Sequence, residues 1–214
     1  GSDGRVLVKK IASTPDDYGR AVLDGLELGI NDLNIQPSDI SEVSHGFTVA
    51  TNAILEGKGE PTALITTEGF RDVLELARIR TPHLYDLYYQ KPPPLVERNL
   101  RFEVAERMTF QGEVLKPLDV PGLEEVVKLI EATGVRSVAI ALLHSYANPE
   151  HEIRVAEAVR ARIPDASLSI SSDLLPEMRE YERTSTTVIN AYVRPVVAEY
   201  LSNLKAEMLA NGIE

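Results

Sequence analysis

The sequence predicts an α/β fold, because short apolar strand patterns alternate with amphipathic helix patterns along most of the chain. The alternation starts with an apolar run at 61–66, a turn at Thr67-Glu68-Gly69 and a helical pattern after it. Strands are expected at 61–66, 137–143 and 166–171, and helices at 70–78, 122–133 and 149–163. This order is typical of a parallel sheet covered by helices.

Length and composition are those of a globular protein. The chain has 214 residues, of which 43% are hydrophobic and 26% charged, and no Ser/Gly-rich linker divides it. We therefore expect one domain over 1–214, with an irregular insertion at about 80–118.

Charge and residue usage exclude several classes of function. The net charge of -11 argues against nucleic acid as a partner, because such binding depends on Lys and Arg neutralising phosphates. The absence of cysteine excludes disulfides and thiolate zinc sites in this chain. No apolar run reaches the roughly 20 residues of a membrane span, and no signal pattern opens the chain, so a cytoplasmic protein is expected.

The start of the chain predicts a strand and a helix. Arg5–Ile11 alternates after the turn dipeptide Asp3-Gly4, which predicts the second arm of a hairpin whose first arm is missing from this chain. An amphipathic helix should follow Ser13-Thr14-Pro15. A second strand is expected at 42–47, with a helix at 48–56 after it.

The regular alternation of strand and helix patterns ends between Arg80 and Leu118, where prolines interrupt short strand-like pieces at 100–104 and 107–110. We interpret this region as an irregular, proline-rich insertion with a small β element. The last helix is expected from about Pro176 to Ala210, with a break at Pro195.

The first polar cluster contains His45, Thr48, Thr51 and Asn52, where a strand gives way to a helix. Ligands of α/β folds bind at carboxyl ends of strands, and hydroxyls with helix-start amides suit an anion. The alternative is that a threonine caps the helix and that His45 is a core histidine.

A second cluster runs from Arg78 to Asp86 and includes Arg80 and His83. Arginine could clamp a carboxylate or phosphate, and histidine could bind a metal or move a proton. A solvated, exposed loop is the alternative.

The third cluster, 177–187, contains Glu180 and Arg183 at the start of the last helix. Glu–Arg pairs three apart on a helix face need no function. Four successive hydroxyl residues at 184–187 are nevertheless poor helix formers, so another influence should favour them there. His144 and His151, which lie outside the clusters, are interpreted as structural.

A parallel sheet could bring all three clusters to one side, so we predict that they share a cleft. In it Thr48, Thr51 and Asn52 would contact substrate or phosphate oxygens. His45 and His83 would orient the substrate or hold a metal, and Arg183 would offset anionic charge.

Four stretches of the sequence resemble the amino-terminal domain of the hydantoinase A/5-oxoprolinase family, which is related to acetone and acetophenone carboxylases. They occur in family order, at 45–53, 63–72, 82–87 and 180–188. Phe47 departs from the family pattern, in which a polar residue is expected, and a hydroxyl role at that position is in doubt.

The resemblance implies a ribonuclease-H-like (actin-like ATPase) architecture, truncated at its N-terminus, and an ATP-dependent hydrolase acting on small cyclic amides such as hydantoin, N-methylhydantoin or 5-oxoproline. ATP with Mg²⁺ is implied for the full-length enzyme, together with its remaining domains and a hydantoinase B-like subunit. The family's phosphate-binding Asp-x-Gly-Gly-Thr turn is not in this sequence, so the nucleotide-binding and metal-binding residues stay unassigned and the isolated fragment is expected to be inactive. A ketone carboxylase subunit and a purely structural or subunit-contact fragment are the alternatives.

Overall fold

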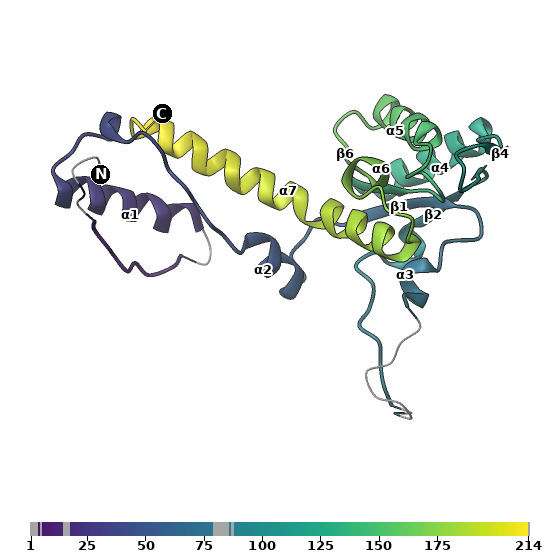
Figure 1. Ribbon diagram of the computed structural model, residues 1–214, viewed down its shortest axis with the longest axis horizontal. Coiled ribbons are helices and arrows are strands. Elements are labelled where there is room, and N and C mark those ends of the chain that lie inside the picture. Colours follow the sequence, from purple (N-terminus) through teal and green to yellow (C-terminus); the bar gives the residue numbers. More distant parts are fainter. Residues whose placement is uncertain (1–3, 5, 15–17, 79–85, 87, 214) are drawn as a thin grey trace. The chain divides into compact units, whose positions relative to one another are not determined.

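The computed structural model describes residues 4, 6–14, 18–78, 86 and 88–213 (Figure 1). The chain divides into two compact units. One unit comprises residues 54–195, and the other comprises residues 1–53 with 196–214. Whether the whole chain forms the single domain expected from the sequence remains a prediction.

A four-stranded parallel sheet is the centre of the 54–195 unit. Its strands lie in the order β2-β1-β5-β6. Their bounds are β1 Thr62–Thr67, β2 Arg101–Val104, β5 Ser137–Ala141 and β6 Ser167–Ile170. Both β1 and β5 are buried along their whole length, as expected for parallel strands covered on both faces. The strands predicted at 61–66, 137–143 and 166–171 are therefore confirmed.

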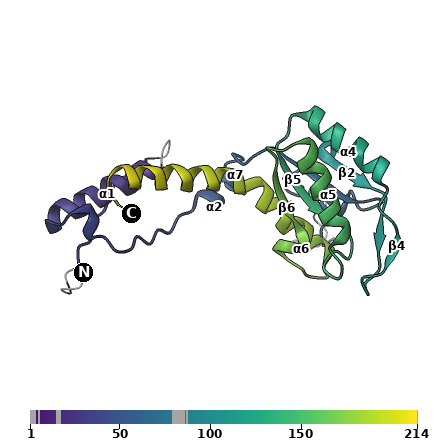
Figure 2. The same cartoon turned by 90° about the horizontal axis from the view of Figure 1, so that it is seen from above.

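Helices α4 (Val120–Thr133) and α5 (Glu150–Arg162) cover one face of this sheet (Figure 2). Their apolar stripes pack on alternate strand residues, among them Ile65 and Ile140, which also face each other across the β1–β5 register. Hydrophobic burial here supplies the larger core cluster of the unit.

The opposite face is covered by the short helix α3 (Val73–Leu76) and by the first turns of α7 (Glu180–Ala210), as Figure 1 shows. The intervening strand residues, such as Leu64 and Ala139, pack there against Val188. Because side chains alternate along a strand, these two sets produce three layers. The remaining helix of the unit, α6 (Ser171–Leu174), follows β6 directly.

The predicted insertion is only partly irregular. Strand β2, together with the 3-10 turn Arg98–Leu100, lies inside its expected bounds but joins the main sheet, pairing in parallel with β1. The small β element is instead the antiparallel pair of β3 (Arg107–Met108) and β4 (Val114–Lys116). The prolines at 92–94 lie before β2, and none lies within the strand. Every residue of β2 therefore keeps its backbone N–H, and the strand can pair within the main sheet.

Helix α7 continues through Pro195 without the predicted break. A proline removes the donor that would bond the carbonyl four residues earlier, which is that of Ala191. In this fold the Ser137 hydroxyl donates to the Ala191 carbonyl at 2.7 Å, and the amide of Glu60 donates to the Tyr192 carbonyl at 2.9 Å. Groups outside the helix therefore satisfy its carbonyls near the proline.

The second unit contains α1 (Tyr18–Leu33), a 3-10 turn at Pro37–Asp39, the first five residues of α2 (Val49–Leu55) and the end of α7. The two strands predicted in this unit are wrong, because the described residues 6–11 and 42–47 form no ladder. A strand pattern needs a neighbouring strand to complete its hydrogen bonds, and neither segment has one among the described residues. Val6 is accordingly 86% exposed.

Candidate functional site

The first polar cluster is built around an aromatic group in the 1–53/196–214 unit. His45 Nε2 lies 2.6 Å from the Tyr200 hydroxyl, and the His45 ring stacks on Phe47 with 5.5 Å between centroids. Phe47 also contacts Tyr200, again at 5.5 Å. These contacts fix the imidazole in the segment that leads into α2 and orient its ring.

Thr48, Thr51 and Asn52 lie at the start of α2, where the amide of Asn52 donates to the Thr48 carbonyl at 2.8 Å. Both threonines are exposed, whereas Val49 and Ala53 turn inward. The helix therefore leaves hydroxyl groups available to a ligand and uses its apolar positions for packing. The fold of this segment supports the predicted location of these residues at a helix start.

The second and third clusters meet in the other unit through an ion pair between Arg78 and Glu182. Glu180 and Arg78 line the same cavity, of about 410 Å³, beside Arg179 and Asp72. Arg80 and His83 lie outside the described residues. The ion pair thus joins the two sequence clusters at their described members.

The charges at this ion pair affect the Glu182 carboxyl. Its own backbone amide and the guanidinium of Arg78 lower the pKa of Glu182 below its ordinary value, against the opposing effect of desolvation. The carboxylate is therefore ionised at neutral pH and holds Arg78 at the rim of the cavity.

Arg183 points inward, in contrast to its neighbours, and is only 1% exposed. Its guanidinium donates to the carbonyls of Leu142 at 2.6 Å and Glu177 at 2.7 Å and lies over the Tyr146 ring. Burial lowers the pKa of Arg183. Its described contacts tie the loop after β5 to α7, and a direct contact with substrate stays a prediction.

A buried polar network, which the sequence did not single out as a group, lies at the carboxyl ends of β1, β2 and β5. The Thr67 hydroxyl donates to Glu106, whose other oxygen lies 2.7 Å from His151 Nδ1. The amide of Leu143 donates to Thr67 at 2.9 Å. All three polar side chains are buried, so the network satisfies groups that would otherwise be costly to bury.

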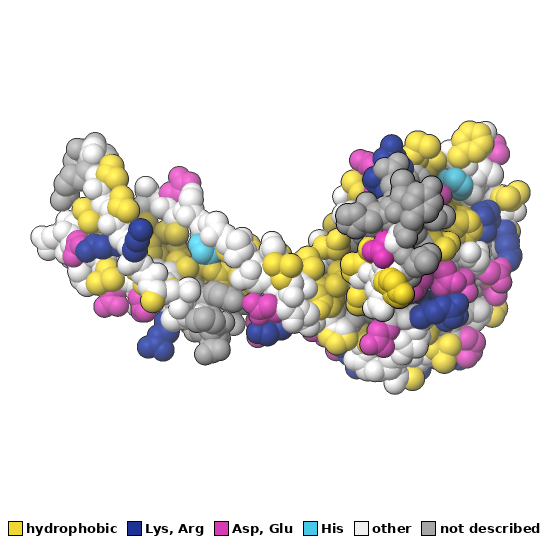
Figure 3. All heavy atoms as spheres, turned by 90° about the horizontal axis from the view of Figure 1, so that it is seen from below, with side chains coloured by type: hydrophobic (Ala, Val, Ile, Leu, Met, Phe, Trp, Pro, Cys, Tyr) yellow, Lys and Arg dark blue, Asp and Glu magenta, His cyan; other side chains and the backbone are white. Residues whose placement is uncertain are grey.

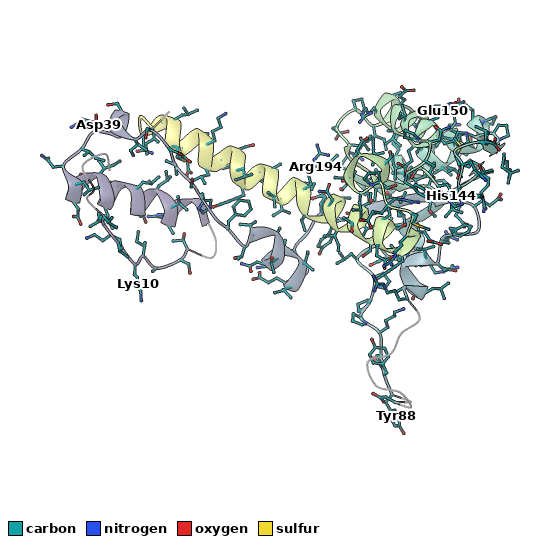
Figure 4. The ribbon with its side chains drawn as sticks, viewed as in Figure 1. Lys10, Asp39, Tyr88, His144, Glu150 and Arg194 are labelled. Atoms are coloured by element: carbon teal, nitrogen blue, oxygen red, sulfur yellow. The ribbon has the colours of Figure 1, made fainter. Side chains whose placement is uncertain are left out.

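Glu152 organises the adjoining end of β6. One of its oxygens accepts bonds from the Leu142 amide and the Ser171 hydroxyl, and the other from the Ser172 amide. His144 lies in the loop between β5 and α5 (Figure 4) and has the unusual φ of 56°. A signal for this network is present in the sequence, since Glu106, His151 and Glu152 are acidic or basic residues beside strand ends and a helix start.

The predicted convergence of all three clusters on one cleft stays a prediction. His45 belongs to one compact unit, and Glu180 and Arg183 belong to the other. Within the unit of residues 54–195 Glu180 lines the cavity, whereas Arg183 is buried and is not among the described lining residues.

Among the described residues, no group of three or more His, Asp or Glu side chains could hold a metal ion. None of the described helices is long and apolar enough to cross a membrane. On the face drawn in Figure 3, basic and acidic side chains are interspersed.

Two solved structures have a fold similar to that of this chain. The ATP-dependent caprolactamase of Pseudomonas jessenii matches 98% of this chain with a TM-score of 0.91 at 34% identity, and the chain covers 31% of that protein chain. The nucleotide-free structure of acetone carboxylase matches 94% of the chain with a TM-score of 0.81 at 26% identity, and 30% of its own chain is covered. The predicted α/β class, of ribonuclease-H-like (actin-like ATPase) type, is confirmed.

Sequence relatives agree. The caprolactamase alpha subunit of Pseudomonas jessenii is 35% identical over 95% of this chain, which spans 30% of its length. The 5-oxoprolinase 1 of Arabidopsis thaliana is 34% identical over 94% of the chain, which spans 18% of that enzyme. Residues 1–163 match the family described as the hydantoinase/oxoprolinase N-terminal region. The chain belongs to the hydantoinase/oxoprolinase family, as a part of its N-terminal region.

Proposed function

We propose that the protein containing this chain is an ATP-dependent hydrolase that opens small cyclic amides of the hydantoin, N-methylhydantoin or 5-oxoproline type. The observation that carries the proposal is the likeness to ATP-dependent caprolactamase over 98% of the chain. The similarity to a 5-oxoprolinase supports the same chemical class.

The proposed chemistry explains why a stable amide would need ATP. The amide oxygen would attack the γ-phosphorus of ATP, and ADP would leave. Water would then add to the activated carbonyl carbon, and the ring C–N bond would break as the nitrogen takes up a proton, which leaves an acyl phosphate. A second water would attack the acyl carbon and release phosphate, which carries the former amide oxygen. The ring-opened product is then a carboxylate, and one ATP and two waters are consumed in total.

The residues of this chain would bind and orient substrate. Thr48, Thr51 and Asn52 would contact substrate or phosphate oxygens from the start of α2, and His45 would orient the ring. In the other unit Arg80, His83 and Glu180 would bind substrate. Arg183, which is buried against the loop after β5, would offset anionic charge.

ATP and Mg²⁺ would be held mainly by other parts of the protein. The described residues offer no cluster of three metal-ligating side chains, and the Asp-x-Gly-Gly-Thr turn is not in this sequence. These residues do not by themselves fit a magnesium–nucleotide site, so no step is assigned to the metal here.

A hydantoinase B-like subunit is the proposed partner, together with the remaining domains of the same polypeptide. The relative from Pseudomonas jessenii is named as an alpha subunit, which supports an assembly of more than one kind of chain. A cytoplasmic location is part of the proposal.

The alternative reaction is ATP-dependent carboxylation of a ketone, and the likeness to acetone carboxylase favours it. A third possibility, a structural or subunit-contact role for this part of the protein, is favoured by the buried network at the strand ends, which joins loops without reaching the surface.

Phosphate release from the full-length protein distinguishes these functions. Release stimulated by a hydantoin or by 5-oxoproline, without bicarbonate, supports the hydrolase. Release that needs both a ketone and bicarbonate supports the carboxylase. If no substrate stimulates release, both reactions are rejected. Calorimetry of nucleotide binding to the isolated chain, which we expect to show none, tests whether this part holds ATP alone.

A further inference from the structure

A second cavity of the 54–195 unit is lined by two basic side chains and by no described carboxylate. It has a volume of about 420 Å³ and lies between the segment at 89–95, the end of α3 and one side of α7. We propose that this cavity, here called the proline cavity, binds a small organic anion with a flat, apolar body, such as an aromatic or cyclic carboxylate. The site is independent of the proposed reaction, because it is argued from the cavity alone.

Cations line the proline cavity and carboxylates do not. Arg78 and Lys91 are its charged residues, and none of its described lining residues is Asp or Glu. In a chain with 33 acidic and 22 basic residues, such a lining is biased toward an anion.

Lys91 is held in position by backbone groups. Its ammonium donates to the carbonyls of Glu75 at 2.6 Å and Leu76 at 2.8 Å, at the end of α3. No described carboxylate pairs with Lys91, so its charge is offset only by carbonyl dipoles. A third N–H of the ammonium is available for a carboxylate oxygen.

The remaining walls favour a flat ligand. Pro92, Pro93 and Pro94 form one wall, whose backbone is stiff because each ring fixes φ. Tyr89 and Tyr181 add aromatic rings, and the other lining side chains are Leu74, Leu95, Ser185, Val188 and Ile189. The volume lies within the range of roughly 300–1,000 Å³ that is common for ligand pockets.

The backbone at the edge of the cavity is in a sparsely populated conformation. Ala77, which lines the cavity, has φ 48° and ψ -134°. Such a conformation in a residue with a Cβ persists only where its surroundings impose it, and it clusters at ligand sites. Here the Ala77 amide donates to the Val73 carbonyl, and Lys91 donates to the carbonyls of the two residues before Ala77.

The neighbouring cavity provides an internal contrast. It shares Ala77, Arg78 and Tyr181 with the proline cavity, but three carboxylates also line it, namely Asp72, Glu180 and Glu182. An anion should therefore prefer the side of Arg78 that faces Lys91.

Binding of benzoate and of its neutral analogue benzamide to the 214-residue chain tests the proposal. We expect saturable benzoate binding, at least about five-fold tighter than benzamide, because one exposed charge pair contributes about 1 kcal/mol. Lys91→Met should remove this preference and leave benzamide affinity unchanged. Ile189→Phe, which fills the cavity, should weaken both ligands.

The matched control is Lys128→Met, which removes a lysine from α4 and should leave the benzoate preference intact. If Lys91→Met lowers thermal stability too far for binding to be measured, the double variant Arg78→Gln/Glu182→Gln removes the other cation without leaving its partner unpaired. Equal binding of benzoate and benzamide, a preference that survives the cation variants, or no saturable benzoate binding would each overturn the proposal.

Discussion

Gly59 packs directly against the ring of Tyr192. A Cβ at this position would lie 2.1 Å from Cε1 of that buried ring. Gly59→Ala should therefore destabilise the protein by about 1–3 kcal/mol through overpacking. Denaturant unfolding measures the change.

Gly29→Ala is the control for this substitution. A Cβ at Gly29 meets nothing within 4 Å, and the residue lies inside α1. This variant should be neutral or more stable by about 0.5–1 kcal/mol, since alanine favours a helix interior. Equal destabilisation by both variants would contradict the packing explanation.

Asp72 should titrate below its ordinary pKa of 3.8. The hydrogen bond from Arg98 lowers the pKa of Asp72, and the charges of Arg98, Arg101 and Arg71 add to this effect against desolvation. A depressed folded-state pKa stabilises the fold above the unfolded pKa, and the stabilisation is lost as pH falls through the folded value. The stability difference between the wild type and Asp72→Asn should thus disappear in acid.

An NMR titration of the Asp72 carboxyl carbon measures this pKa directly. Arg98→Gln should move the midpoint upward, whereas Arg136→Gln, which removes a similar exposed pair with Asp165, should leave it in place. An Asp72 midpoint at or above 3.8 in the wild type would refute the assignment of this shift.

The continuity of α7 through Pro195 depends on a hydrogen bond from outside the helix, between the Ser137 hydroxyl and the Ala191 carbonyl. Ser137→Ala should destabilise the protein by about 1–2 kcal/mol, because the buried Ala191 carbonyl loses its described donor. Pro195→Ala restores a helical amide that can reach that carbonyl. The loss caused by Ser137→Ala should therefore be smaller, by about 0.5–1 kcal/mol, in the Pro195→Ala background.

A double-mutant cycle from urea unfolding measures this coupling. Ser167→Ala, at the start of the neighbouring strand β6, serves as a control that should show no coupling to Pro195→Ala. Additive effects of Ser137→Ala and Pro195→Ala would show that the hydroxyl does not replace the missing helical bond.

The elements that the sequence predicted correctly are those with strong local patterns. The buried runs of β1 and β5 and the apolar stripe of α4 depend on residues close together in the chain. The strands expected at 5–11 and 42–47 needed a partner strand, which a local pattern cannot supply. Strand β2 was placed in the insertion because prolines surround it, although its pairing depends on β1, more than 30 residues earlier.

For the candidate site, too, local sequence patterns indicated the polar clusters but not the contacts that their side chains make. Hydroxyl and charged residues near strand ends and helix starts indicated the clusters. An ion pair joins Arg78 of the second cluster to Glu182 of the third, and the shared cleft stays a prediction. The inward direction of Arg183 and the pairing of Glu106 with His151 could not be read locally. Arg183 donates to the backbone carbonyl of Leu142, and Glu106 pairs with the side chain of His151, so both depend on segments that lie far apart in the chain.

For the molecule as a whole, the four matching stretches identified the family, and the family match over residues 1–163 confirms it. The reaction is a different matter. The chain spans 30% of the caprolactamase alpha subunit and 18% of the plant 5-oxoprolinase, so most of either enzyme lies outside the compared region. Residue roles must therefore be tested in the full-length protein.

His45→Ala in the full-length protein should lower kcat by about 100-fold or more if the imidazole orients the substrate or moves a proton. Tyr200→Phe is the matched variant, since it removes only the hydroxyl 2.6 Å from His45 Nε2 and keeps the aromatic contacts. If His45 only supports the fold through Tyr200, both variants should reduce turnover alike and lower the melting temperature together. If it acts on substrate, His45→Ala should lose far more turnover than Tyr200→Phe at similar stability. Steady-state phosphate release with thermal unfolding of each variant decides between these outcomes, and normal turnover in His45→Ala would reject the catalytic role.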